Sequence, residues 1–194
     1  MVGELALEDR LARLVLSTGW MAHALEMGRE VAPADWLIGA GAIRSLVWDH
    51  LHGATAAVPK DIDLVFFDAG GLNAEREAQV LGELVRCAPE LPWDVKNQAA
   101  VHLWYPQVFG LTVEPLVSSA DAVATWPETA TAVGIRLLPN DRIEIVAPFG
   151  LVDLFGLVCR RNPRRVTLED YRLRIRDKRI AQRWPLVTIL DEPR

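Results

Sequence analysis

The chain has 194 residues, of which 51% are hydrophobic and 24% are charged, and its formal net charge is −5. This composition supplies enough apolar side chains for a substantial core and excludes a globally disordered chain. The acidic balance excludes a strong overall attraction to nucleic acid or to anionic membranes. At this length we expect one domain, with room at most for a small appendage.

Cys87 and Cys159 are the only cysteines, and they are far apart in the sequence. This spacing predicts neither a disulfide framework nor a thiolate metal site, and it fits a reducing cytoplasm. Glu4, Glu8 and Asp9 interrupt the N-terminus where a secretion signal would be apolar. No apolar run approaches the roughly 18 residues that a membrane-spanning helix needs. We therefore expect a cytoplasmic protein with no membrane partner.

The first third of the chain predicts helices, then a strand and another helix. Leucines at helical spacing over residues 4–30 predict one or two helices, with a break near Gly19. Residues 35–39 predict a short buried strand, and residues 41–51 predict a helix that starts after a glycine turn. Residues 62–67 are almost continuously apolar, which indicates a strand buried on both faces within a mixed sheet.

The middle third continues this alternation of helices and strands. Asn73 is a suitable N-cap for a helix that ends near Cys87. Residues 93–98 predict a third strand, which we extend through residues 102–104. Further along, residues 133–146 predict a hairpin with a proline-containing turn.

Helical patterns account for most of the remaining chain. Residues 120–125 predict a short helix before the hairpin, and residues 149–159 predict an apolar helix after it. Pro163 ends that segment, and Thr167 with Asp170 forms a capping box that opens the last helix. Together these elements predict an α+β fold, in which a mixed β-sheet has flanking helices and the chain ends in a helical C-terminal segment.

Two carboxylates open the strand predicted at residues 62–67. Asp61 and Asp63 are two positions apart and therefore point to the same face of a strand, while Ile62 and Leu64 point to the other. Two like charges held this closely need a cation or a shared proton. The pair therefore predicts a divalent metal site. The alternative is a solvated strand end at which Asp61 caps the preceding loop.

A glycine turn precedes this acid pair. Gly39 and Gly41 lie between a predicted strand and a predicted helix. Backbone without a Cβ atom can approach a phosphate closely, and a helix N-terminus presents free N–H groups and a positive dipole. The turn therefore predicts phosphate binding next to the metal site. The alternative is a tight turn that binds nothing.

A two-metal site needs one more ligand on an adjacent element. Asp94 is the candidate, because it lies near the start of the third predicted strand. The alternative is an exposed aspartate at a strand end. Asp68, by contrast, belongs to the face of Ile62 and Leu64, and we assign it to the turn that follows the strand.

The segment from Leu37 to Arg44, Leu-Ile-Gly-Ala-Gly-Ala-Ile-Arg, followed by Asp-Ile-Asp-Leu-Val at 61–65, resembles the nucleotidyltransferase superfamily typified by DNA polymerase β. CCA-adding enzymes carry a similar segment. A closer resemblance, over about residues 15–190, is to a bacterial family of nucleotidyltransferase-like proteins of unassigned substrate. The segments that carry this closer resemblance are 93–99, 102–104, 121–123, 126–131, 147–154 and the last helix with Trp184-Pro185.

The resemblance implies a Mg²⁺-dependent nucleotidyltransferase that transfers a nucleoside monophosphate from an NTP to an unidentified acceptor hydroxyl, with release of pyrophosphate. The acceptor would be a small molecule, RNA or protein. Residues 1–194 would form a single nucleotidyltransferase-like domain, with a core at about 35–146 and a helical segment at about 148–184. Two Mg²⁺ ions are expected at the acids. In this scheme Asp61 and Asp63 bridge the metals, and Asp94 holds the metal that activates the acceptor. The turn at Gly39, Ala40 and Gly41 approaches the β- and γ-phosphates, and Arg44 adds positive charge there.

Two other functions stay open. The turn has no hydroxyl side chain, so the chain could instead be a nucleotide- or partner-binding module of the same fold that has lost turnover. The basic residues near the C-terminus motivate a toxin-like transferase that acts on tRNA. Between Arg160 and Arg183 there are ten Lys and Arg residues and three acids. This basic segment either flanks a phosphate-binding cleft or is a solvated helix face paired with the acidic body, and we favour the second interpretation.

Two further groups of residues are candidates for the cleft. Lys96, Gln98 and His102, with Asn97 between them, form a polar run that could line the cleft or belong to a half-exposed strand. Trp104 and Trp126 could stack a base, although most tryptophans of such a chain belong to the core.

Overall fold

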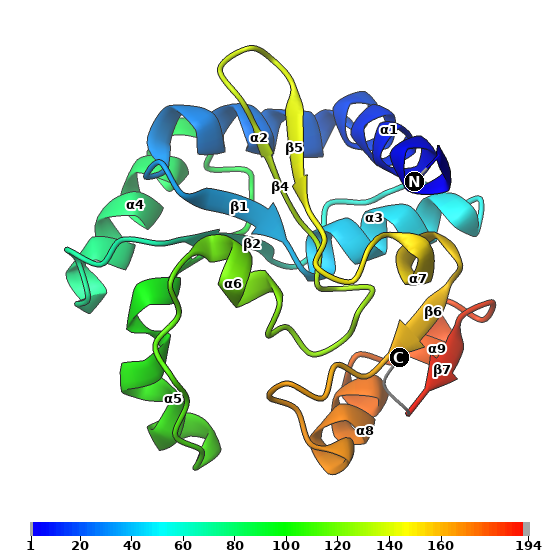
Figure 1. The fold of residues 1–194 in the computed structure, drawn as a ribbon. Helices are drawn as coiled ribbons and strands as arrows, with labels where there is room; N and C mark the ends of the chain where they lie inside the picture. The colour runs from blue at the N-terminus through cyan, green and yellow to red at the C-terminus, as the bar shows by residue number, and fades with distance from the viewer. Residues whose placement is uncertain (1, 192–194) are drawn as a thin grey trace.

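The computed structural model describes residues 2–191, and its centre is a five-stranded mixed sheet of order β3-β2-β1-β4-β5 (Figure 1). Strands β2 and β3 are parallel, and the other neighbours are antiparallel. A second, two-stranded parallel sheet joins β6 to β7 near the C-terminus. The strands are β1 (Trp36–Gly39), β2 (Ile62–Phe66), β3 (Trp93–Asn97), β4 (Gly134–Leu137), β5 (Ile143–Val146), β6 (Val158–Arg160) and β7 (Thr188–Leu190).

The helices follow the predicted alternation through the first half of the chain. The predicted helix break and the predicted N-cap are both confirmed. The first helix ends at Ser17, before Gly19, and the Asn73 side chain accepts a hydrogen bond from the Arg76 N–H. The helices are α1 (Val2–Ser17), α2 (Gly19–Val31), α3 (Gly41–Leu51), α4 (Ala74–Cys87), α5 (Val101–Phe109), α6 (Ser119–Val123), α7 (Val152–Phe155), α8 (Leu168–Asp177) and α9 (Ile180–Arg183), with a 3₁₀ turn at Gln98–Ala100. None of the helices within residues 2–191 is both long and apolar enough to cross a membrane.

The two faces of the sheet have different environments. Ile62, Leu64 and Phe66 of β2 point into the main core, which the apolar sides of α1 to α4 complete. Val65 points to the opposite face, where only a small apolar cluster with Leu37 covers the sheet. Because side chains alternate along a strand, the second face is also the one that Asp61 and Asp63 share. The predicted burial of β2 on both faces is correct except at Asp63, which is partly exposed.

The predicted extension of the third strand through residues 102–104 is wrong. Strand β3 ends at Asn97, whose side chain accepts a hydrogen bond from the Ala99 N–H and so starts a 3₁₀ turn. The chain then forms α5, which ends at Gly110 in the left-handed conformation. Figure 1 shows that α5 leaves the sheet and projects from the body. Apolar residues at 101, 104, 105 and 108 have helical spacing, and this spacing favours a helix over the predicted strand.

The predicted apolar helix at residues 149–159 is also wrong for most of its length. Only α7 is helical there, and Gly156 with left-handed Leu157 turns the chain into β6. Strand β6 is stabilised by pairing with β7, which comes from the end of the chain. A distant partner of this kind leaves no local signal. The helix predicted to open at Thr167 is α8, and it begins as predicted, because the Thr167 hydroxyl accepts a hydrogen bond from the Asp170 N–H.

Candidate active site

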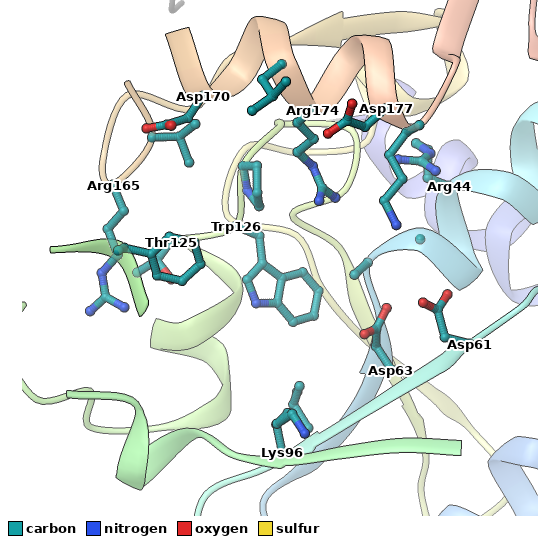
Figure 2. Close-up of a pocket in the computed structure, with 18 of the residues that line it drawn as sticks. Arg44, Asp61, Asp63, Lys96, Thr125, Trp126, Arg165, Asp170, Arg174 and Asp177 are labelled. Carbon is teal, nitrogen blue, oxygen red and sulfur yellow. The ribbon is translucent and has the colours of Figure 1, made fainter. Parts of the chain in front are cut away.

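A cavity of about 1300 Å³ lies against the face of the sheet that carries the acid pair. Asp61 and Asp63 lie on one side of it, and α8 lies on the other (Figure 2). The turn before α3 contributes Ala40 and Gly41. The rest of the lining comes mainly from α3, the loop before β2, β3, α5, the segment before β4, and the segment from Arg165 through α8 to α9, so segments from most of the chain meet here.

The three predicted acids approach one another from neighbouring strands. Asp61 immediately precedes β2, and Asp63 pairs in register with Asp94 of β3. Burial raises the pKa of Asp63 to about 6, with smaller contributions from the charges of Asp61 and Asp94, while Lys178 and Arg174 act in the opposite direction. Asp63 is therefore a carboxylate whose negative charge its surroundings only partly compensate.

Asp94 differs from the other two acids in its surroundings. Its side chain is 45% exposed, it pairs with Lys96 Nζ at 3.1 Å, and it is outside the lining of the cavity. Within residues 2–191, no three His, Cys, Asp or Glu side chains lie close enough together to hold a metal ion by themselves. The structure thus places Asp61 and Asp63 in the cavity and Asp94 beside it.

The glycine turn has two parts with different surroundings. A Cβ atom at Gly39 would lie 2.6 Å from ring atoms of Trp126 and 2.6 Å from the Val133 carbonyl oxygen, so close packing requires glycine there. Gly39 is not part of the cavity lining. Ala40 takes a positive φ of 51°, which lets the chain turn sharply into α3. A Cβ atom at Gly41 would lie 4.0 Å from Asp63 Oδ2, so this part of the turn lies next to the acid pair.

Arg44 lies at the back of the cavity with its side chain enclosed. The residue is 3% exposed, and its guanidinium lies 5.4 Å from the Trp48 ring centroid and 5.0 Å from that of Trp184. Burial lowers the pKa of Arg44, and the nearby Glu128 carboxylate partly offsets this effect. Among the described residues its Nε atom has no hydrogen-bond partner. Arg44 therefore supplies positive charge to the cavity from a fixed position.

Helix α8 is held over the cavity by a buried carboxylate that the sequence did not reveal. Glu128 is buried, and its Oε1 accepts a hydrogen bond from Arg174 Nε at 2.6 Å. Its Oε2 accepts one from the Thr131 hydroxyl at 2.5 Å. Figure 2 shows the Arg174 side chain pointing from α8 toward the side of the cavity where Asp63 lies. The 46-residue separation of Glu128 and Arg174 explains why no local pattern predicted the pair.

Both interpretations of the basic segment hold, for different residues. Arg164 and Arg172 form ion pairs with Asp121 and Asp191, as expected for a surface face. Another group lines the cavity, with Arg174 joined by Arg165, Lys178, Arg179 and Arg183. The sequence contains a pattern that predicts this second group, because residues 170, 174 and 178 are four positions apart and therefore lie along one side of α8 and the turn that follows it.

The polar run after Asp94 is divided in the same way. Lys96 and Gln98 line the cavity. Asn97 is buried and structural, since its amide donates hydrogen bonds to the carbonyl oxygens of Asp68 and Gly71. Asp68 belongs to the turn as predicted, where it accepts from the Gly70 N–H and pairs with Arg76.

The fold is that of nucleotidyltransferases. A solved NMR structure described as revealing a CCA-adding enzyme head domain matches with a TM-score of 0.79 and 26% identity, over 93% of this chain and 94% of that chain. A family model described as nucleotidyltransferase matches residues 27–189, and the chain belongs to that family. The resemblance seen in the sequence is thereby confirmed.

Longer CCA-adding enzyme chains share the fold at lower identity. A CCA-adding enzyme with CTP matches with a TM-score of 0.54 and 18% identity, over 93% of this chain and 42% of that chain. The Thermotoga maritima CCA-adding enzyme complexed with tRNA matches with a TM-score of 0.57 and 16% identity, over 92% and 42%. The chain thus spans less than half the length of these enzymes. A search of curated protein sequences found no significant match.

Proposed function

We propose that the protein is a Mg²⁺-dependent nucleotidyltransferase that moves a nucleoside monophosphate from an NTP to an acceptor hydroxyl. The acceptor oxygen forms a bond to the α-phosphorus, the bond from that phosphorus to the bridging oxygen breaks, and pyrophosphate leaves. Two free cysteines are consistent with a cytoplasmic setting for this reaction.

One observation supports this proposal above all others. An acidic side of the cavity, with Asp61 and Asp63, faces a basic side formed by α8 and α9. A triphosphate with its metal carries both signs of charge, so it complements both sides at once. The basic side chains Arg174 and Lys178 would hold the phosphates, and the N–H groups of the turn at Ala40 and Gly41 would add hydrogen bonds.

The acids fit Mg²⁺ in number and kind. Mg²⁺ is usually held by one or two carboxylates together with phosphate oxygens of the substrate, and seldom by a cage made of protein alone. Asp61 and Asp63 meet this requirement without a third ligand in place. Burial, and to a lesser extent the charges of Asp61 and Asp94, raise the pKa of Asp63, and a bound cation would offset both effects. When bound, the metal would stabilise the charge that develops on the α-phosphate.

Asp94 would act on the acceptor. It is in register with Asp63 on the next strand, and its exposed carboxylate is accessible from outside the cavity. We assign it to receive the proton of the acceptor hydroxyl, with Lys96 holding it in place. Arg44, being enclosed, would contribute charge behind the phosphates and would remain in position during turnover.

Label transfer tests this function. The protein is incubated with each NTP, labelled at the α- or the γ-phosphate, and with RNA, protein and small-molecule fractions as acceptors. We expect the α-label alone to join the acceptor, with pyrophosphate released, and we expect chelation of Mg²⁺ to stop the reaction. Asp63→Asn should lower the rate about a hundredfold or more, because a metal ligand is lost.

Asp141→Asn is the matched control, since it makes the same chemical change on an exposed turn between β4 and β5. Its rate should equal that of the parent protein. Transfer of the γ-label, or α-transfer that survives Asp63→Asn, would show that the reaction is a different one. NTP binding without any product would instead support the binding module that lacks turnover.

A further inference from the structure

One side of the cavity has a composition unlike the rest. Three rings of α5 form a cluster, with centroids 5.9 Å apart for Trp104 and Tyr105 and 4.5 Å apart for Tyr105 and Phe109. All three line the cavity together with Val108 and Leu111. The cluster continues to the surface, where Phe109 is 56% exposed. Large apolar side chains left in this way on a projecting helix indicate a binding surface.

A cation accompanies the rings. The Arg165 guanidinium lies 5.5 Å from the Tyr105 ring centroid and joins the segment before α8 to α5. It also donates a hydrogen bond to the Glu114 carbonyl oxygen at 3.3 Å, so its position is fixed from two sides. Figure 2 shows Arg165 at the opposite end of the cavity from Arg44 and the acid pair. The far end therefore combines stacking surfaces with one positive charge.

The size of the cavity leaves space for a second group. Pockets for a single small ligand have volumes of about 300–1000 Å³. The volume here is about 1300 Å³, and the part near Asp61 and Asp63 is the part suited to a triphosphate. Helix α5 lines the same cavity as Asp61 and Asp63, so a group bound against its rings would share one continuous space with the triphosphate.

We infer that α5 and Arg165 form the acceptor subsite, and that this subsite binds the terminal nucleotide of a single-stranded nucleic acid. The base would stack on the rings of Trp104 and Tyr105, and Arg165 would pair with the adjoining phosphate. Stacking on aromatic side chains beside a cation is the usual way in which single strands are bound without base-specific contacts. This inference rests on the proposed function, because it assigns the acceptor of the same site.

The exposed end of the ring cluster favours a strand over a free nucleotide. One base would be covered by Trp104 and Tyr105, which are the more enclosed rings. Phe109 and Val108 lie further out, where only a ligand that continues beyond its terminal nucleotide would contact them. Arg165, which lines this end of the cavity, is placed to pair with the backbone of such a strand.

Binding of a labelled strand tests the inference without any turnover. A single-stranded RNA of about 12 nucleotides, labelled at its 5′ end, is titrated in the absence of NTP and Mg²⁺, and its anisotropy is measured. We expect Trp104→Ala and Phe109→Ser each to weaken binding about tenfold. Arg165→Gln should reduce the slope of log affinity against log salt by about 0.7, since one phosphate contact is lost.

Leu5→Ser is the matched control, because Leu5 is 62% exposed on α1 and outside the cavity. It should bind the strand as the parent protein does. Phe109 is itself exposed, so its variant remains informative if Trp104→Ala does not fold. Equal binding by Phe109→Ser and the parent protein would overturn the subsite, and equal competition by a mononucleotide would overturn its assignment to a strand.

The same variants distinguish this inference from the proposed function. Asp63→Asn should bind the strand normally but transfer no label. If the parent protein transfers label to a small molecule and binds no strand, the reaction stands and the acceptor assignment fails. If the strand binds as expected and no label is ever transferred, the subsite stands and the proposed reaction fails.

Discussion

Asp63 shows how a single residue can be placed for chemistry at a cost to stability. Its carboxylate is largely buried near two other acids, and its pKa is raised to about 6. A hydrophobic or amide side chain of similar size would fit the same place without that charge. The position is therefore explained by what it binds, because packing alone would favour a neutral residue.

The sign of the pKa shift gives a first prediction. The folded protein holds the Asp63 proton more tightly than the unfolded chain, so the stability from this group is complete below about pH 4 and is lost as the pH rises through 6. Asp63→Asn should therefore stabilise the metal-free protein at pH 8 by about 2 kcal/mol, and by much less at pH 4.5. Thermal unfolding at the two pH values measures this, and a variant less stable than the parent at pH 8 would contradict it.

Gly39 gives a second prediction at the same scale. An added methyl group would meet the Trp126 ring and the Val133 carbonyl oxygen, both at 2.6 Å. Gly39→Ala should lower the free energy of unfolding by about 3 kcal/mol, because neither neighbour can move without disturbing the sheet. Gly82→Ala, on the open surface of α4, is the control and should be neutral or slightly stabilising. Urea unfolding compares them, and a small loss at Gly39 would show that Trp126 can move aside.

At the scale of elements, α8 is positioned by charge more than by apolar packing. Tyr171 is its only buried residue, and two contacts attach the helix to the body of the protein: the Tyr171 hydroxyl donates to the Cys159 carbonyl oxygen, and Arg174 pairs with Glu128. The carboxylate of Glu128 lies in the interior, where an unpaired charge would be costly. The basic side of the cavity thus depends on a buried ion pair.

Removing one partner of this pair gives a third prediction. Arg174→Met should destabilise the protein by about 3 kcal/mol, because the buried Glu128 carboxylate loses its ion-pair partner. Adding Glu128→Gln should restore part of this loss, since the charge is then removed as well. Arg176→Met, on the exposed side of the same helix, is the control. Equilibrium denaturation of the parent protein, the two single variants Arg174→Met and Glu128→Gln, and the double variant gives the coupling, and strictly additive losses would contradict the pairing.

The sequence predicted those elements whose signals are local. The glycine turn, the acid pair and the Thr167 capping box depend on neighbours within a few residues, and all three have the predicted form. Strands β6 and β7 depend on pairing between distant segments, so the apolar residues near Cys159 were mistaken for a helix. Helix α5 shows the opposite error. The prediction extends the preceding strand into this helix, although from Val101 onward the apolar residues have helical spacing.

Of the candidate site, the sequence predicted the acid pair, the adjoining turn with Arg44 and several residues after Asp94, but it did not predict that the basic segment as a whole would close the cavity. Asp61 and Asp63 share a face because strands alternate, and this follows from spacing alone. The basic side comes from a segment more than 100 residues later, which folds back over the sheet. Its approach is fixed by contacts such as Trp184 with Asp49, at 2.7 Å, and Arg174 with Glu128. No sequence pattern within either segment predicts that it contacts the other.

At the scale of the whole molecule, the C-terminal segment completes a site that begins near residue 39. One face of the central sheet packs on α1 to α4, and the other supports the acids and the cavity. Figure 1 shows α5 and α8 projecting on the same side of the body, and both contribute to the cavity lining. The fold thus brings an acidic, a basic and an aromatic surface together, which suits a metal-bound triphosphate and an acceptor.

A crystal structure with Mg²⁺ and an NTP analogue that cannot be cleaved between its α- and β-phosphates tests this arrangement most directly. We expect Mg²⁺ bound by oxygens of Asp61 and Asp63 at about 2.1 Å, together with phosphate oxygens of the analogue. The triphosphate should lie between these acids and the basic side chains of α8, next to Gly41. An analogue bound elsewhere, or a metal away from Asp61 and Asp63, would contradict the proposed active site.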